Sequence, residues 1–219
     1  MIKADLHVHT TFSGDSEITP EKLVARVRAV GLDCIAVADH NTAEGALKIK
    51  GMAPPFKVIV AEEIETPEGE IIGLFLKETI PAGLTPEETV TRIHAQGGLA
   101  CVPHPFDRFR SSAMQEKTLE RIAALIDIVE VANARTLPMQ DLSRPQKFAE
   151  NYGKLMGAGS DSHTLPEIGR AYVEMPDFNT PEEFLQAMMQ GVVHNYRVSA
   201  AAQARGLAGR LTRKLVGRR

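Results

Sequence analysis

Aromatic residues and cysteines are scarce in this chain of 219 residues, which has no Trp, 5% aromatic residues and 2 Cys. The core must therefore be mostly aliphatic. Cys34 and Cys101 both lie in short apolar runs, which predicts two buried, reduced thiols rather than a disulfide. No apolar run approaches the ~18 residues of a membrane span, and the N-terminus lacks the long apolar stretch of a secretory signal. We therefore expect a cytoplasmic protein with no stable membrane insertion.

Two common catalytic motifs are also missing. The chain has no glycine-rich phosphate loop of the Walker type, because the segment AGSDSH that ends at His163 lacks the lysine and the length. No GxSxG motif of the serine-hydrolase type occurs either. The sequence thus favours neither of these two routes to phosphate binding or ester hydrolysis.

Charge is distributed unevenly around a net value of -3. Residues 197–219 contain seven basic and no acidic side chains, so the rest of the chain is acidic. We therefore expect one folded domain over residues 1–196 and a basic C-terminal tail over residues 197–219. Three leucines recur at every fourth position of the tail, which is typical of a basic amphipathic helix on an acidic partner, RNA or a membrane surface. Three tail glycines oppose this, and a solvated tail or one docked on the acidic body is the alternative.

Short apolar runs bounded by Gly, Pro or charge predict buried strands. The runs are residues 4–8, 34–38, 58–61, 71–76, 99–102, 128–131 and 155–158. Three Thr-Pro-Glu segments, beginning at Thr19, Thr85 and Thr180, predict helix starts with Thr as N-cap and Pro in the first turn. Strands that alternate with helices predict βα units and a parallel sheet. Seven strands in under 200 residues indicate an α/β barrel with one unit fewer than the eight-stranded form.

Most of the histidines follow these predicted strands, since five of the seven stand at or just beyond a strand's C-terminal end. The five are His7, His9, His40, His104 and His163. Ligands bind at the carboxyl ends of strands in such folds, so we expect these side chains to converge on one rim. A single histidine after a strand is usually a capping or core residue, and the prediction depends on the joint pattern. His94 and His194 lie elsewhere, and we expect a helix-end cation and a structural residue.

Carboxylates accompany these histidines. Glu63 ends the third predicted strand and Asp161 precedes His163 by two positions, as His7 precedes His9, so each pair points to one face of its strand. A mixed imidazole and carboxylate set suits Zn, Mn or Fe, and a bridging carboxylate such as Glu63 can hold two metals as a hydrolytic clamp. Asp5 and Asp39 adjoin these histidines, where they either orient imidazoles or cap local backbone.

These motifs resemble those of the PHP (polymerase and histidinol phosphatase) family of metal-dependent phosphoesterases. The resemblance rests on DLHVHT, ADHN, AEEIE, HPF and GSDSH and covers about residues 2–195. It implies a distorted (β/α)7 barrel with two or three divalent metals, Zn, Mn or Fe. It also implies phosphoester hydrolysis by water or hydroxide held on the metal cluster.

The resemblance implies a distribution of ligands over three metal positions. His7, His9, Glu63 and Asp161 would form the first position, Glu63 and His104 the second, and Asp15, His40 and His163 the third. Glu62 is the rival of Glu63, but the family carboxylate directly precedes the apolar residue, which favours Glu63. Asn133 stands where many members have a histidine after the sixth strand, and as a weak neutral ligand it makes two metals credible. Some members have a histidine at the position of Glu70, which we expect to be solvated here.

The expected reaction is attack on the phosphorus of a small phosphomonoester, a nucleotide or an oligonucleotide end. His40 or His163 would protonate the leaving group, and Arg135 and Arg170 would hold the phosphate unless they form surface salt bridges. Arg108 and Arg110 are further cations near His104. Two alternatives remain open: hydrolysis of C–N or cyclic phosphate bonds on the same metals, and a non-catalytic metal-binding regulatory module.

Overall fold

The computed structural model describes residues 1–137 and 139–196. The basic tail of residues 197–219 lies outside the described residues, so its amphipathic helix and its contacts with an acidic partner, RNA or a membrane stay predictions. Every helix among the described residues is too short or too polar to cross a membrane.

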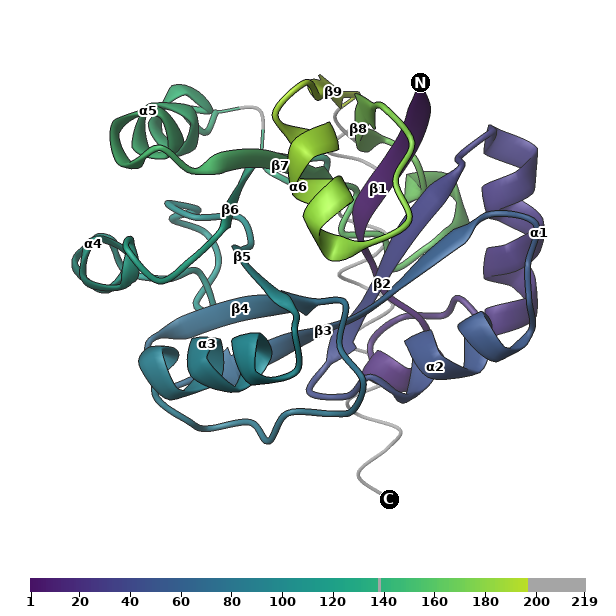
Figure 1. Cartoon of the computed structure of the whole chain (residues 1–219), viewed down its shortest axis with the longest axis horizontal. Helices are drawn as coiled ribbons and strands as arrows, with labels where there is room; N and C mark the ends of the chain where they lie inside the picture. The colour runs from purple at the N-terminus through teal and green to yellow at the C-terminus, as the bar shows by residue number, and fades with distance from the viewer. Residues whose placement is uncertain (138, 197–219) are drawn as a thin grey trace.

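The described residues contain one nine-stranded sheet in the order β7-β6-β5-β4-β3-β2-β1-β8-β9 (Figure 1). The strands are β1 (Ile2–Val8), β2 (Cys34–His40), β3 (Lys57–Thr66), β4 (Gly69–Leu74), β5 (Leu99–Val102), β6 (Ile128–Asn133), β7 (Leu155–Gly159), β8 (Ala171–Met175) and β9 (Val192–Asn195). Neighbouring strands are parallel from β1 to β3 and from β5 to β7, and antiparallel around β4, β8 and β9. Most of the sheet is therefore built from βα units, as the alternating pattern predicts.

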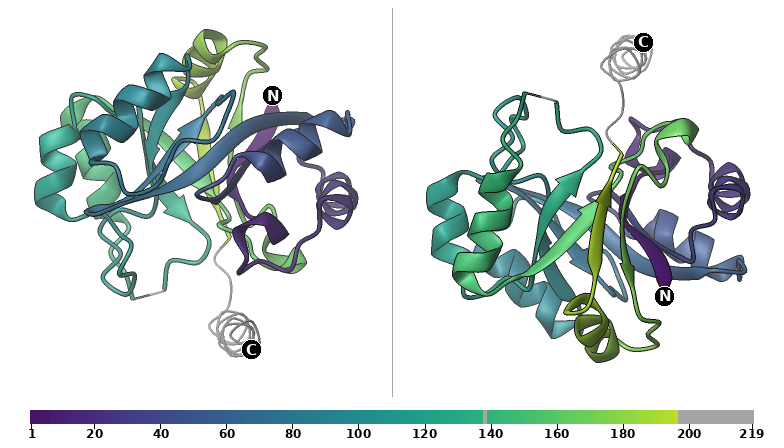
Figure 2. Two further views of the ribbon diagram at one scale, coloured as in Figure 1. Left: turned by 90° about the horizontal axis from the view of Figure 1, so that it is seen from below. Right: turned by 90° about the horizontal axis from the view of Figure 1, so that it is seen from above.

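The two halves of the sheet meet at β1 and the end of β7, where the sheet nearly closes on itself. The backbone N–H of Asp161 donates to the carbonyl of His7 at 2.7 Å, and the N–H of His9 donates to the carbonyl of Ser162 at 3.0 Å. Strands β7 and β9 also lie side by side when the molecule is viewed from above (Figure 2). The predicted α/β class and distorted (β/α)7 barrel are confirmed.

All seven predicted strands are present, but the expectation of a wholly parallel sheet is wrong at β4. Only Pro67 and Glu68 separate β3 from β4, and a two-residue connection can join antiparallel strands only. Strands β8 and β9 were not predicted from the sequence. The residues of β8 alternate between buried and partly exposed, and those of β9 are all at least partly exposed, so neither strand forms a continuous buried apolar run.

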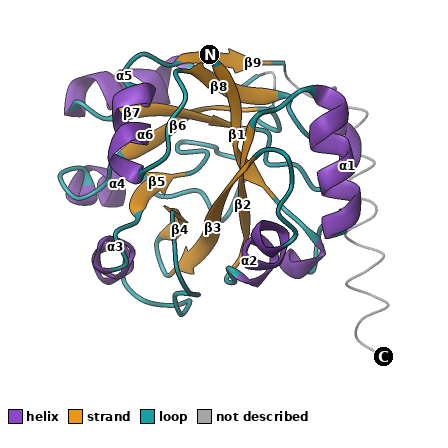
Figure 3. Ribbon diagram, turned by 45° about the vertical axis from the view of Figure 1, so that its right-hand side comes forward, coloured by secondary structure: helices purple, strands orange, loops and turns teal. Residues whose placement is uncertain are grey.

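Six α-helices lie around the outside of the strands (Figure 3) in the described part of the chain. They are α1 (Pro20–Val30), α2 (Glu44–Gly51), α3 (Pro86–Ala95), α4 (Glu116–Ile122), α5 (Ser143–Tyr152) and α6 (Pro181–Met188). The hydroxyls of Thr19, Thr85 and Thr180 accept backbone N–H bonds at the starts of α1, α3 and α6. The three Thr-Pro-Glu signals therefore mark helix starts as predicted.

Two apolar layers form the core, one between the helices and the strands and one inside the barrel. Val37 and Val60 belong to the first layer, whereas Ala36, Ala38 and Ala61 belong to the second. Small side chains on the inner face suit a narrow barrel. The strand ends beyond these alanines are where polar side chains enter the barrel mouth.

Candidate metal centre

Strand alternation decides which acidic side chains enter the barrel mouth. In β3, Ile59 and Ala61 face inward, so Glu63 faces inward and Glu62 faces outward. Glu63 is 1% exposed and lies beside four imidazoles, whereas Glu62 accepts a hydrogen bond from the N–H of Ile80 at 2.8 Å. The geometry thus favours Glu63 over its neighbour, in agreement with the interpretation of the motif.

Glu63 lies at the middle of the cluster, within reach of four histidines. Its Oε2 is 3.4 Å from His7 Nε2, 3.4 Å from His9 Nε2 and 3.0 Å from His40 Nδ1. Its Oε1 is 3.0 Å from His104 Nε2. One carboxylate therefore faces donor atoms from the ends of β1 and β2 and from the loop after β5, as a bridging ligand must.

Asp161 supplies a second carboxylate from the loop that follows β7. Its Oδ1 lies 3.5 Å from His9 Nε2 and 3.4 Å from His163 Nδ1. His163 Nε2 in turn lies 3.1 Å from Asp15 Oδ2, and His40 Nε2 lies 3.7 Å from the same oxygen. Asp15, His40 and His163 therefore gather beside the His7 and His9 pair.

The backbone is strained at two of these residues. His104 has φ of 31° and Asp161 has φ of 51°, although neither is glycine. The N–H of His104 donates to Glu130 at 2.7 Å, and the N–H of Asp161 donates to the His7 carbonyl, so both conformations are held by buried partners. Non-glycine residues in this region cost of order 1–3 kcal/mol and concentrate at functional sites.

Hydrogen bonds fix the tautomers of His7 and His9. Glu130 Oε1 lies 3.1 Å from His7 Nδ1 and, as a carboxylate, accepts a proton there. Ser13 donates its hydroxyl proton to Asp39 at 2.8 Å, so the hydroxyl accepts from His9 Nδ1 at 2.9 Å. Both Nδ1 atoms therefore carry protons, and both Nε2 atoms face the cluster.

These Nε2 atoms lie 2.9 Å apart, and two nitrogen lone pairs approach that closely only around a shared positive charge, a proton or a metal ion. Donor atoms ~2.0–2.1 Å from a tetrahedral zinc ion stand ~3.3 Å from one another. The separations of 2.9–3.5 Å in the cluster are close to that value. The residues present thus fit a divalent cation.

The electrostatics of the cluster favour the same conclusion. Burial and the nearby His163 hold the pKa of His9 well below its ordinary value, and burial also lowers the pKa of His163. Burial opposes a charge on His7, but Glu63, Glu130 and Asp161 raise the pKa of His7 well above its ordinary value. The carboxylates thus favour positive charge at the cluster, while the imidazoles of His9 and His163 stay neutral and keep lone pairs free for a cation.

Glu130 and Ser13 are functional residues that sequence reasoning missed. Glu130 is 3% exposed, and besides His7 it receives the N–H of His104 and the amide of Asn133 at 2.9 Å. A charged residue inside the apolar run IVEVAN was a usable signal, because a buried carboxylate needs polar partners. Ser13 carried no comparable signal.

Asn133 does not have the geometry of a ligand, although it lies at the cluster. Its amide nitrogen donates to Glu130 at 2.9 Å and to Asp161 Oδ2 at 3.3 Å. Its oxygen accepts from the backbone N–H of Arg135 at 2.9 Å and from Arg110 at 3.4 Å. Both amide protons and both lone pairs of the oxygen take part in hydrogen bonds. Asn133 therefore has no lone pair left for the weak metal ligation that was predicted.

The expectation that Glu70 is solvated is wrong. Glu70 is 8% exposed, and its carboxylate lies 3.5 Å from His104 Nε2 and 3.8 Å from His40 Nδ1. Burial and the neighbouring Glu63 raise the pKa of Glu70 to about 7. Glu70 shares the inward face of β4 with Ile72 and Leu74, and the antiparallel direction of β4 brings its first residues, rather than its last, to the barrel mouth.

The cluster opens into a cavity of about 360 Å³, within the range of small-molecule sites. Its lining residues are His40, Glu70, Asp107, Phe109, Arg110, Ser111, Ser112, Arg135, Leu137, Asp161 and His163. Arg135 is buried, lies 2.5 Å from His163 Nδ1 and donates to the Asp161 carbonyl. The structure does not bring Arg170 to this cavity: its side chain is exposed and donates to the carbonyl of Pro166.

Replacing the two predicted phosphate-binding arginines should therefore have unequal effects. We expect Arg135→Met to lower kcat/KM for a phosphate ester at least ~10-fold, because a guanidinium at the cavity wall is lost. Arg170→Ala should leave the kinetics unchanged. Steady-state assays of both variants check this, and equal losses would contradict the placement of Arg170.

The remaining predicted roles are structural. His94 pairs with Asp127 at 2.9 Å on the surface, and His194 stacks on Tyr172 with ring centroids 4.8 Å apart. Asp5 accepts the N–H groups of Ser160 and Gly169, and Asp39 reaches His9 only through Ser13, so neither touches an imidazole. Cys34 and Cys101 are buried and free.

Comparison with known proteins shows which family the chain belongs to. The model of the PHP domain matches residues 5–74, and that of the PHP-associated region matches residues 141–193. The uncharacterized protein MJ0417 of Methanocaldococcus jannaschii is 36% identical over 197 residues, which cover 85% of this chain and 79% of that protein. The chain belongs to the PHP family. A second relative from the same organism, the uncharacterized protein MJ1587, is 42% identical over 146 residues, 61% of this chain and 82% of that protein.

Solved structures share the PHP fold at low sequence identity. A two-domain protein of Bacteroides vulgatus with a predicted PHP-like metal-dependent phosphoesterase superposes with a TM-score of 0.71 at 16% identity. The match covers 89% of this chain and 64% of that one. An amidohydrolase of Chromobacterium violaceum, solved with bound sulfate and no metal, gives a TM-score of 0.63 at 16% identity and covers 91% and 99%. These likenesses establish the barrel.

Proposed function

We propose that this PHP protein is a metal-dependent phosphoesterase that hydrolyses a small phosphomonoester, a nucleotide or an oligonucleotide end. The observation that carries the proposal is the convergence of His7, His9, His40 and His104 on the single carboxylate of Glu63, beside a cavity with arginine in its wall. The names of the structural neighbours, one a predicted phosphoesterase and one an amidohydrolase, agree with hydrolysis.

Two or three ions of Zn, Mn or Fe, held by the histidines with Glu63, Asp15 and Asp161, would supply Lewis-acid polarisation of a phosphoryl oxygen and activation of water. The chain's own residues position the substrate around them. Arg110 and Arg135 both line the cavity, and their guanidinium groups can each donate two N–H bonds to phosphoryl oxygens. Guanidinium groups at fixed positions also offset charge that develops on the transferring phosphoryl group.

The leaving group needs a proton, and His40 and His163 line the cavity. A ring nitrogen of either residue that is not bound to a metal lies at the cavity wall, where it can donate to the leaving oxygen. Glu130 and Ser13 hold protons on the Nδ1 atoms of His7 and His9 and so keep the Nε2 atoms turned inward. These two residues position ligands without touching the substrate.

A phosphate-ester panel with matched histidine variants tests the proposal. Protein loaded with Mn, Zn or Fe should release phosphate from at least one aryl phosphate, nucleotide or oligonucleotide, and removal of the metal by a chelator should abolish this. His40→Asn should lose the activity, while His94→Asn, a surface histidine bonded to Asp127, should retain it. Release of ammonia or an amine without phosphate would move the assignment to C–N hydrolysis. No turnover on either class with metal bound would support a regulatory module.

A further inference from the structure

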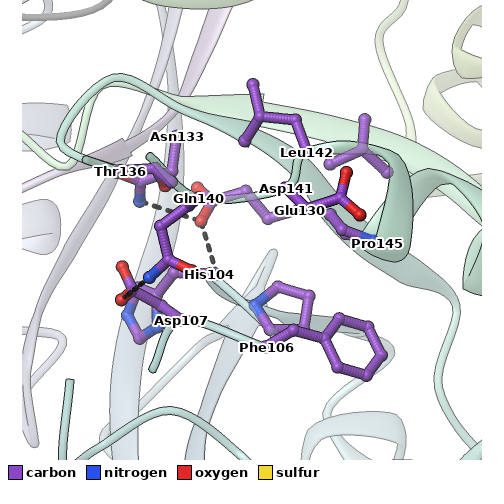
Figure 4. Close-up of a pocket in the computed structure, with 12 residues that line it drawn as sticks. His104, Phe106, Asp107, Glu130, Asn133, Thr136, Gln140, Asp141, Leu142 and Pro145 are labelled. Carbon is purple, nitrogen blue, oxygen red and sulfur yellow. Dashed lines mark hydrogen bonds between the residues drawn. The ribbon is translucent and has the colours of Figure 1, made fainter. Parts of the chain in front are cut away.

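Asn133 turns a donor, not an acceptor, toward the cluster. Its NH2 group faces the carboxylates of Glu130 and Asp161, so the reverse orientation would place oxygen against two anions. Figure 4 shows Glu130 bonded both to the Asn133 amide and to His104, with Gln140 and Asp107 bonded to each other beside them. The end of β6 therefore offers no lone pair to a cation.

Arg110 fills the space that faces this amide. Its Nη1 atom lies 2.5 Å from Asp161 Oδ2, its Nη2 donates to Asn133 Oδ1 at 3.4 Å, and its Nε donates to Asp107 Oδ2 at 3.3 Å. Asp107 is itself held by Gln140 and by the N–H of Phe109. Three separate partners thus fix the guanidinium, which leaves 23% of the side chain exposed to the cavity.

The two oxygens of Asp161 consequently face different charges. Oδ1 faces His9 and His163, with Arg135 farther away at 3.8 Å, while Oδ2 receives Arg110 at 2.5 Å and the amide of Asn133. A guanidinium never loses its charge at ordinary pH, so it repels any further cation at Oδ2. Oδ1 alone remains for a metal.

The donor geometry of the described residues points the same way. Three sets of three donors have their ligand atoms within 4.8 Å of one another. The sets are His7, His9 and Glu63; His9, His40 and His163; and His40, Glu63 and Glu70. None of them contains His104 or Asp161, the carboxylate that Arg110 binds.

We propose that the guanidinium of Arg110 takes the place of a metal ion beside Asp161 and Asn133, so that this chain binds two divalent cations and not three. One cation lies at His7, His9 and Glu63, and the other at His40 and His163. The inference rests on the metal-centre part of the proposed function, but not on any substrate.

Counting metals on intact protein tests the inference without an activity assay. Metal-depleted protein is equilibrated with Mn²⁺ or Zn²⁺, and bound ions are counted by elemental analysis and by native mass spectrometry. We expect two ions per chain in the unmodified protein. Asn133→His and Arg110→Gln should each still bind two, because the guanidinium or the amide donor remains. The double variant should bind three.

Arg108 supplies the matched control, since it is an exposed arginine two positions away that is absent from the cavity lining. Asn133→His combined with Arg108→Gln should stay at two ions. Three ions in the unmodified protein, or two in a double variant whose circular dichroism matches the parent, would overturn the inference alone. A protein that binds no metal would overturn the proposed function with it. If the double variant does not fold, the single variants still test the inference. A third ion bound by Arg110→Gln alone, or by Asn133→His alone, would contradict it, because the inference requires both changes.

Discussion

Glu63→Gln is expected to lower kcat/KM for any phosphate ester by at least ~1000-fold. Glu63 is the one carboxylate within 3.4 Å of His7, His9, His40 and His104 among the described residues. An amide can offer only one oxygen, and it places an N–H donor where a second cation should bind. A metal clamp contributes several kcal/mol to transition-state stabilisation, and ~4 kcal/mol corresponds to about 1000-fold in rate.

The neighbouring acid provides the control for this variant. Glu62 is as buried as Glu63, but it faces the other side of β3 and bonds to the N–H of Ile80. Glu62→Gln keeps an oxygen for that bond, so activity and metal content should stay near those of the parent. Steady-state kinetics and metal analysis of both variants decide the matter. Equal losses in the two variants would mean that Glu63 acts through the fold and does not bridge metals.

The barrel was predictable because its strands are short, apolar and bounded by breakers. Seven strands and three Thr-capped helix starts follow from local patterns whose physical basis is burial and capping. The reversal of β4 was not predictable from strand patterns alone, since it depends on how few residues separate Thr66 from Gly69. Strands β8 and β9 lacked an apolar run because their side chains are only partly covered.

At the site, the ligand residues were predictable from the sequence, but most of the residues that hydrogen-bond to them were not. The positions of His7, Glu63 and His104 follow from strand ends that share one rim, and the structure brings them together. The predictions for Glu70 and Arg170 were wrong because each depends on a loop or turn. The turn before β4 brings Glu70 to the cavity, and the loop after β7 leaves Arg170 away from it. Ser13 is only four residues from His9, but its hydroxyl is oriented by Asp39 across 26 residues, which a local pattern does not encode.

Gly159→Ala is expected to disrupt both stability and metal binding, because β7 lies directly against β1 at this glycine. A Cβ at residue 159 would lie 2.2 Å from His7 Cβ and 2.8 Å from Glu130 Oε1. Neither neighbour can move freely, since His7 is in a strand and Glu130 holds the Nδ1 proton of His7. Overpacking of this kind costs ~1–3 kcal/mol, which corresponds to a fall in Tm of roughly 2–12 °C in a domain of this size.

A second glycine separates this local effect from the general effect of adding a methyl group. Gly51 ends α2, and a Cβ there meets no atom within 4 Å, so Gly51→Ala should leave Tm nearly unchanged or raise it slightly.

Thermal unfolding with and without added Mn²⁺ measures both the stability and the metal binding of these variants. The parent and Gly51→Ala should be stabilised by the metal, because ligands that bind only the folded state raise Tm. Gly159→Ala should gain much less, since the added methyl displaces His7 from the position in which its Nε2 meets His9 and Glu63. A Gly159→Ala protein with the Tm and metal response of the parent would mean that β1 and β7 are not closed at His7.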